Sequence, residues 1–273
     1  MPLGNVGKKV SDALTQTVRG AGDVSESVIE VVRSSVVEGL RGARDIAVET
    51  SGLAGDAVAG AIHAGNRVGG ELGSVAKGAV VGTIRGVGEV TTVTAGVLSD
   101  TIRAAIKGTS EVGGDVNKAA RGAAGGALAT TKSVGLGIED TAYGVARGAI
   151  QGAKETGADL AAVAKSTVLG TISGTKEAGG DVITAIQGTA SGSIKAAAEV
   201  GGDLASVARS VVEGAIEGAK SVGVKAEEAA SAAATGAVKA AGDVSQTSAV
   251  AVTKAVSGTI AGVKVVIRTP KKK

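Results

Sequence analysis

The sequence lacks most of the side chains that usually build a compact globular core. Its 273 residues include no Cys, Trp or Phe, a single Tyr (Tyr143) and a single His (His63). Aromatic side chains normally supply much of the apolar area that a core buries. The apolar residues here are mostly Ala and Val with some Ile and Leu, and Gly adds a further 45 residues. Small side chains bury little area each, at about 25 cal/mol per Å², so we expect no compact single-core globule.

Other absences narrow the possible architectures. Proline occurs only at Pro2 and Pro270, which fits long helix because a proline inside a helix costs about 3 kcal/mol. The lack of cysteine excludes a disulfide framework. No run of about 18 uncharged apolar residues occurs, and the first ten residues contain no apolar signal core, so neither a transmembrane span nor a secretory signal is predicted.

The charges and the rare side chains offer no chemistry. Lys and Arg number 29 against 26 Asp and Glu, and the excess lies largely in Lys271, Lys272 and Lys273. That tail is a solvated end or an electrostatic contact with an anionic surface. Without a basic patch or aromatic platforms, no nucleic acid is expected as a partner. His63 and Tyr143 replace Arg or Lys of other repeats and have no catalytic neighbours. We therefore predict no enzyme activity, no cofactor, no metal site and no small-molecule substrate.

A 22-residue repeat runs through the chain. The segments GAIHAGN at 60, GTIRGVG at 82, GAIQGAK at 148 and GTIAGVK at 258 all start in one 22-residue phase. The full frame has twelve registers, from position 16 to position 258, without insertion or deletion. Its third position is always a branched aliphatic: Val18, Leu40, Ile62, Ile84, Ile106, Leu128, Ile150, Ile172, Ile194, Ile216, Val238 and Ile260. Such regularity indicates a repeat architecture.

Two further columns follow the same phase. One lies six positions later and includes Val24, Ile46, Val90 and Val112, and the other lies ten positions later and includes Leu72, Val116, Leu160, Val182 and Leu204. Eleven residues make three helical turns, so on a helix all three columns fall on one apolar arc. Charged residues lie outside the arc, with an acidic stripe formed by Glu71, Asp115, Asp159, Asp181 and Asp203.

The predicted fold class is all-α. We expect a long continuous amphipathic helix of twelve 22-residue repeats, possibly hairpinned, over residues 16–268. Residues 1–15 form a lead-in in repeat phase and residues 269–273 a basic tail. A β-solenoid is the structural rival, but alternation with period two is poor, opposite charges recur at i,i+4, and only three Asn are present for a ladder.

The high glycine content makes an isolated helix of this sequence unstable in water. Forty-five helical glycines would cost on the order of 40 kcal/mol relative to Ala, so the chain is expected to be largely disordered when free in water. A lipid surface or another helix must cover the apolar arc. Coiled-coil seams use large Leu and Ile side chains, whereas this arc is broad and shallow, as in an interfacial helix. The three apolar columns are therefore predicted to face lipid.

The segments GTISGTKEAGGDV (170–182) and GALATTKSVGLG (126–137) share a Gly, Thr, Val, Ala and Lys vocabulary without aromatics. In this the chain resembles the 11-residue-repeat helices of the perilipins, especially the perilipin 4 repeat region. GTKEAG (174–179) and GAKETG (152–157) resemble the repeat of α-synuclein. The resemblance implies a transition from coil to helix on a lipid droplet or membrane. The period of 22 rather than 33 and the lack of a globular perilipin domain depart from that pattern.

The sequence thus predicts a lipid-surface coat protein, cytoplasmic and peripheral on a lipid droplet or membrane surface. The first alternative is self-association into a right-handed helical bundle or filament, in which Gly and Ala allow close backbone approach. The second is a protective disordered protein like the late-embryogenesis-abundant class, which also uses 11-residue repeats. Those chains are usually much more hydrophilic than the mean hydropathy of +0.28 found here.

Overall fold

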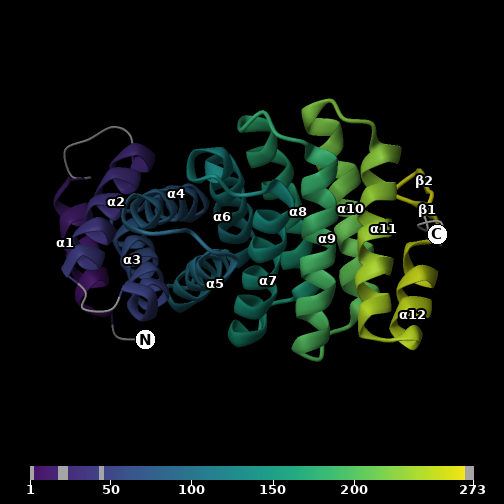
Figure 1. The fold of residues 1–273 in the computed structure, drawn as a ribbon, viewed down its shortest axis with the longest axis horizontal. Coiled ribbons are helices and arrows are strands. Elements are labelled where there is room, and N and C mark those ends of the chain that lie inside the picture. The colour runs from purple at the N-terminus through teal and green to yellow at the C-terminus, as the bar shows by residue number, and fades with distance from the viewer. Residues whose placement is uncertain (1–2, 18–23, 43–45, 268–273) are drawn as a thin grey trace.

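A computed structural model describes residues 3–17, 24–42 and 46–267. Over these residues the chain forms a row of α-helices that ends in a small β-hairpin (Figure 1). The elements are α1 (Asn5–Thr17), α2 (Val24–Gly42), α3 (Ile46–Arg67), α4 (Leu72–Val90), α5 (Ala95–Glu111), α6 (Val116–Thr130), the 3₁₀ turn η1 (Thr131–Val134), α7 (Ile138–Thr156), α8 (Leu160–Glu177), α9 (Val182–Glu199), α10 (Leu204–Val222), α11 (Ala226–Val244), α12 (Gln246–Val256), β1 (Gly258–Ile260) and β2 (Val263–Val265). The all-α prediction is confirmed at this level.

The helices form two layers. Helices α1 to α11 pack most extensively on the helix two places along the chain, as α4 does on α2 and α6, and less extensively on their immediate neighbours, whereas α12 packs most extensively on α11. Odd-numbered helices therefore make one layer and even-numbered helices the other. The array grows along its long axis from α1 at one end to α12 at the other (Figure 1). This is the arrangement of a helical-repeat protein in which one supersecondary unit stacks on the next.

The predicted continuous helix is wrong, because the chain turns about once per repeat. The turns use glycine with positive φ, where a side chain would be strained, at Gly69, Gly113, Gly135, Gly157, Gly179, Gly201 and Gly223. In several turns the next residue closes a Schellman motif: the N–H of Gly114 donates to the carbonyl of Thr109 at 2.8 Å, and that of Gly202 to Ala197 at 2.7 Å. Phased glycine thus marks helix ends.

An acidic residue then starts the next helix. Asp115 accepts from the backbone N–H groups of Asn117 and Lys118 at 2.9 and 3.2 Å. Equivalent N-caps are Glu71, Asp159, Asp181 and Asp203. The predicted acidic stripe on a helix face is therefore wrong for these residues. A carboxylate at a helix N-terminus satisfies free N–H groups and the helix dipole, which explains why Gly-x-Asp recurs in phase.

Close approach between helices of one layer explains much of the remaining glycine. A Cβ on Gly126 of α6 would lie 2.7 Å from the carbonyl oxygen of Lys77 in α4. The same relation joins Gly214 of α10 to Lys165 of α8 at 2.9 Å, and Gly236 of α11 to Gln187 of α9 at 2.9 Å. In each pair the residues are 49 positions apart in the sequence. Helix thus packs on helix through backbone, at a distance that only glycine permits.

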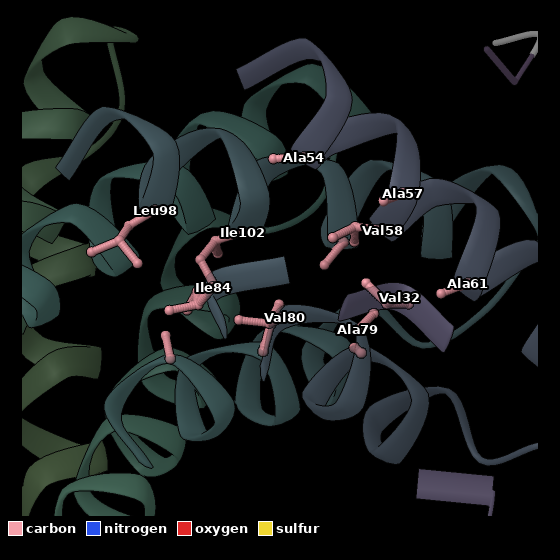
Figure 2. Packing of buried hydrophobic residues seen from close by; sticks show 14 of the residues in the cluster. Val32, Ala54, Ala57, Val58, Ala61, Ala79, Val80, Ile84, Leu98 and Ile102 are labelled. Atoms are coloured by element: carbon pink, nitrogen blue, oxygen red, sulfur yellow. The ribbon is translucent and has the colours of Figure 1, made fainter. Parts of the chain in front are cut away.

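The interior between the layers is aliphatic. Val58 of α3, Val80 and Ile84 of α4, and Ile102 of α5 point toward one another and are buried (Figure 2). Ala residues fill the remaining space, as Ala57, Ala61 and Ala79 do in the same region (Figure 2). The core is therefore long and thin rather than a single globule, and small side chains suffice because the helices stand close together.

The last of the twelve repeats, which begins at Gly258, is not helical. Residues 258–265 form an antiparallel hairpin in which Gly258 pairs with Val265 and Ile260 with Val263. Ala261 and Gly262 make its two-residue turn with φ of 47° and 79°. The predicted repeat array up to residue 268 is thus helical only to Val256. The β-branched run Val263-Lys264-Val265-Val266-Ile267 favours strand, and β2 packs on α11.

Candidate functional site

The first predicted lipid-facing column lies in the protein interior. The members with at most 1% of their surface exposed are Leu40, Ile62, Ile84, Ile106, Leu128, Ile150, Ile172, Ile194 and Ile216. Val238 is half-buried, and Ile260 is buried in β1 rather than in a helix. Val18 lies outside the described residues. In the folded array these side chains contact other helices, so contact with lipid would require the layers to separate.

The other two columns flank the turns. Val90 ends α4 and Val112 follows α5, whereas the first residues of five helices are Leu72, Val116, Leu160, Val182 and Leu204. Val182 is buried and the others are half-buried. A Cβ on Gly202 would lie 2.6 Å from the Leu160 side chain, so the second turn glycine leaves room for the residue that opens the helix two places earlier. The side chains of Val24 and Ile46 lie outside the described part of the structure.

Ion pairs cross-link neighbouring helices of one layer. Lys165 of α8 lies 2.9 Å from Glu217 of α10, and Arg147 of α7 lies 3.0 Å from Glu199 of α9. A hydrogen bond from Lys195 of α9 to Asp243 of α11 raises the pKa of the lysine above its ordinary value. Each such surface pair contributes at most about 1 kcal/mol. The ladder chiefly fixes helix register and gives both faces mixed charge.

A groove lies between α3 and α5. Its volume is about 460 Å³, and Gly52, Gly55 and Ala59 of α3 and Ala104 and Gly108 of α5 line it. Where α7 carries Gly144 and Gly148 against α5, α5 itself carries Asp100 and Ala104 against α3. These larger side chains keep α5 further from α3. A Cβ built on Gly55 would lie 3.6 Å from the Cβ of Ala104, which is an ordinary van der Waals contact. The groove is thus a local departure from glycine packing.

The charged rim of this groove is internally paired. Arg103 contacts Asp100 at 2.6 Å and Glu155 at 3.8 Å, and Lys107 contacts Glu155 at 2.8 Å. Asp56 accepts from the backbone N–H groups of Gly4 and Gly7, each at 2.7 Å, and so caps α1 from the neighbouring helix. These carboxylates therefore already have partners.

The two rare side chains lie on one layer. His63 of α3 is half-buried, with Nε2 3.6 Å from a carboxylate oxygen of Glu111 on α5. Tyr143 of α7 is half-buried beside the groove that contains Arg103 and Arg147. The turn motif and the positions of the packing glycines are not among the sequence predictions. Gly-x-Asp at multiples of 22 residues marks the turns, and the glycine two residues before the branched aliphatic column marks the packing positions.

Sequence comparisons add no identity to this geometry. No family model matches the chain, and no curated protein gives a significant match. Within residues 3–17, 24–42 and 46–267, no helix has the length and apolar character needed to cross a bilayer. The same residues hold no cluster of three or more His, Cys, Asp or Glu that could bind a metal ion. The site must be interpreted from its own contacts.

Proposed function

We propose that the chain is a structural protein: a closed helical-repeat rod that acts through its length and its mixed-charge faces. The observation that carries this proposal is the glycine-to-backbone packing repeated at a 49-residue separation along the array. Such packing lets the aliphatic columns of the two layers satisfy one another. The proposal is related to the first alternative above, a helical bundle, but here the helices of a single chain pack on one another.

The N-terminal end supports a closed rod rather than an open filament. Gly60, Gly82 and Gly126 occupy the repeat position that packs on the backbone of the helix two places earlier. At the same position the first two repeats have Gln16 and Glu38, whose side chains are exposed. These two helices have no helix two places before them among the described residues, so a larger polar residue is tolerated. A polar face on these first described helices discourages the stacking of a further helix on that face.

The lipid-coat function remains a second candidate, favoured by one observation. The interior between the layers is mainly aliphatic, with some buried Thr and Ser, and short turns join helices of similar length. Separation of the layers would therefore expose the apolar arc that the sequence predicts for lipid contact. In this candidate the protein is cytoplasmic and peripheral on a droplet or membrane, and folding in water competes with adsorption.

Circular dichroism and light scattering distinguish the two candidates. In lipid-free buffer the rod is expected to be strongly helical and monomeric, with small-angle scattering of an elongated particle. Neutral vesicles or oil droplets should leave its helicity and its amide-exchange protection unchanged. A coil spectrum that becomes helical only with lipid would overturn the rod and establish the coat. Concentration-dependent growth into fibres would contradict a closed end.

A further inference from the structure

The C-terminal end of the array has an unusual surface. It consists of α12, which packs on α10 and α11, and of the hairpin, whose β2 packs on α11. Figure 1 places α12, β1 and β2 together at the end of the row opposite α1. We call the exposed residues of 244–267 the C-terminal tip.

The tip carries the exposed large apolar side chains of the described chain. Val244 at the end of α11 is 45% exposed, Val250 in α12 is 60% exposed, and Val266 just after β2 is 53% exposed. Elsewhere in the described residues the large aliphatic side chains are buried or half-buried. Isolated exposed valines are ordinary, and Val244 lies at the far end of α11 from Ser231, which contacts Val266. Val250 and Lys254, however, lie one turn apart on α12, and Val266 and Lys264 belong to the hairpin that follows it, so these last elements suggest a contact surface.

The charge of the tip is of one sign. Residues 246–267 contain Lys254 and Lys264 and no acidic residue, and both lysines are exposed. Neither forms an ion pair with another described residue, in contrast to Lys77, which lies 2.7 Å from Glu177 on the even-numbered layer. In the sequence Arg268, Lys271, Lys272 and Lys273 follow. Within residues 246–267 the charged side chains are thus exclusively basic, in contrast to the mixed charge of the two layers.

We propose that the C-terminal tip docks the rod end-on to an anionic lipid bilayer. Exposed valines enter the headgroup region, and Lys254 and Lys264 contact lipid phosphates and carboxylates. The apolar and basic side chains that α12 and the hairpin expose match the mixed chemistry of such an interface. The lack of Trp and Phe makes the insertion shallow. The buried aliphatic columns remain inside the rod.

A second copy fits this surface less well. Symmetric pairing of two tips would bring Lys254 and Lys264 near their own counterparts, and like charges oppose such contact. A nucleic acid would meet the lysines but leave the valines without partners, and the tip offers no aromatic side chain for base stacking. An anionic bilayer accommodates both kinds of side chain.

The test is vesicle sedimentation of the full chain with neutral phosphatidylcholine vesicles and with vesicles containing about one-third phosphatidylserine. We expect binding to the anionic vesicles only, weakened by high salt. Each basic residue near an anionic surface strengthens binding about fivefold, so Lys254→Glu with Lys264→Glu should weaken binding by more than about 25-fold. Val250→Ser with Val266→Ser should weaken it on the order of tenfold.

A matched control makes the same charge change away from the tip. Lys8 in α1 and Lys118 in α6 are exposed lysines away from the tip. The double substitution Lys8→Glu with Lys118→Glu should change vesicle binding by no more than about threefold. Equal loss in this control would overturn the tip and leave only general electrostatics. Binding to neutral vesicles, or a dimer removed by the valine variants, would also overturn it.

The docking proposal can be wrong while the rod proposal is right. A chain that is helical and monomeric in buffer but binds neither vesicle contradicts docking alone. Amide exchange of the bound protein gives the converse check: protection retained at Ile150 and Ile172 shows that the layers stay closed. Loss of that protection would mean that the apolar columns, rather than the tip, contact lipid.

Discussion

A Cβ on Gly192 of α9 would lie 2.5 Å from the carbonyl oxygen of Tyr143 in α7. Real Cβ atoms do not approach a carbonyl so closely, and the obstructing atom belongs to a backbone that cannot rotate away. Glycine at this position therefore gains more from helix–helix contact than it loses in helix propensity, since the propensity loss is about 1 kcal/mol.

Gly192→Ala should accordingly destabilise the array. We expect a loss of about 1–3 kcal/mol, because the added methyl forces α9 away from α7. Gly52→Ala in α3 is the matched control, since nothing lies within 4 Å of its built Cβ. There the gain in helix propensity should stabilise the protein by about 1 kcal/mol. Urea unfolding measures both, and equal effects of the two substitutions would contradict glycine-mediated packing.

The N-cap Asp181 predicts a pH-dependent contribution to stability. Its carboxylate accepts from the Thr184 hydroxyl at 2.7 Å and from the Ile183 N–H at 2.9 Å. The hydroxyl bond, opposed by partial burial and aided by the backbone bonds, lowers its pKa below the ordinary 3.8. A lowered folded-state pKa gives stability that is full at neutral pH and lost as pH falls through that value.

Asp181→Ala should therefore lower the free energy of unfolding by about 1 kcal/mol at pH 7. The difference from wild type should shrink below pH 3.8 as the carboxyl becomes protonated. Asp181→Asn keeps an N-cap acceptor without titrating, so it should retain much of the stability and lose this pH dependence. Thermal unfolding at several pH values checks both. A constant Ala difference down to pH 2 would contradict capping by the charged form.

Thr171 of α8 is a buried hydroxyl without a partner. Its Oγ1 makes no hydrogen bond among the described residues, whereas Thr167, one turn earlier, donates to the Val163 carbonyl at 2.8 Å. Both residues are fully buried. Thr171→Val keeps the shape and removes an unpaired polar atom, so it should stabilise by about 1 kcal/mol, while Thr167→Val should destabilise by about 1 kcal/mol. The opposite order in denaturant unfolding would refute this difference.

Ala261 in the hairpin turn has φ of 47°, a left-handed conformation that costs a non-glycine residue about 1–2 kcal/mol. Asn is suited to the first position of such a turn when Gly follows, as Gly262 does here. Ala261→Asn should therefore slow amide exchange within residues 258–265. Ala251→Asn, exposed in α12, serves as a control that leaves the turn unchanged. Faster exchange in the hairpin of Ala261→Asn would contradict the turn geometry.

Much of the secondary structure follows from the sequence, since the 22-residue phase predicts helix and places Ile84, Ile150 and Ile216 on one apolar arc. The helix ends do not follow from the composition, because glycine lowers helix stability at some positions, allows close backbone approach at others and ends helices at still others. Gly113 and Asp115 belong to a turn, and Gly126 belongs to a helix contact. These roles differ by position within the repeat, so the total glycine content could not separate them.

The partner of the apolar arc was harder to predict. Shallow Val, Ala and Gly faces suit lipid, but they also suit another helix when glycine brings backbones together, as Gly214 does with Lys165. The groove beside Asp100 follows from two residues that break the packing column, and only the three-dimensional pairing of α3 with α5 gives that break a meaning. The sequence predicts a basic tail at residues 269–273, but only the three-dimensional arrangement places Lys254 and Lys264 on the last elements of the array.

Deletion of residues 160–203 tests whether the repeats form a modular rod. This removes α8 and α9 and joins Asp159 directly to Leu204, so an aspartate still precedes α10. Gly214 would then pack on the backbone of Arg121 in α6, where Gly170 of α8 packs in the full chain. Gly236 would pack on the backbone of Tyr143 in α7, where Gly192 of α9 packs in the full chain. Each helix thus regains an equivalent neighbour. We expect a folded, helical monomer with a shorter scattering profile and a melting temperature lowered by only a few degrees, because repeat stability depends on nearest neighbours.

Deletion of residues 160–170 is the discriminating control. It removes three helical turns, about eleven residues, and so preserves the phase of the apolar arc, but it leaves α8 too short to span its layer. A continuous amphipathic helix would tolerate this deletion at least as well as the longer one. A rod with a turn in every repeat would not, because α6 and α10 lose the helix that lies between them. Lower stability of the shorter deletion, measured by thermal unfolding, therefore supports the rod, and equal stability of the two deletions would favour the continuous helix.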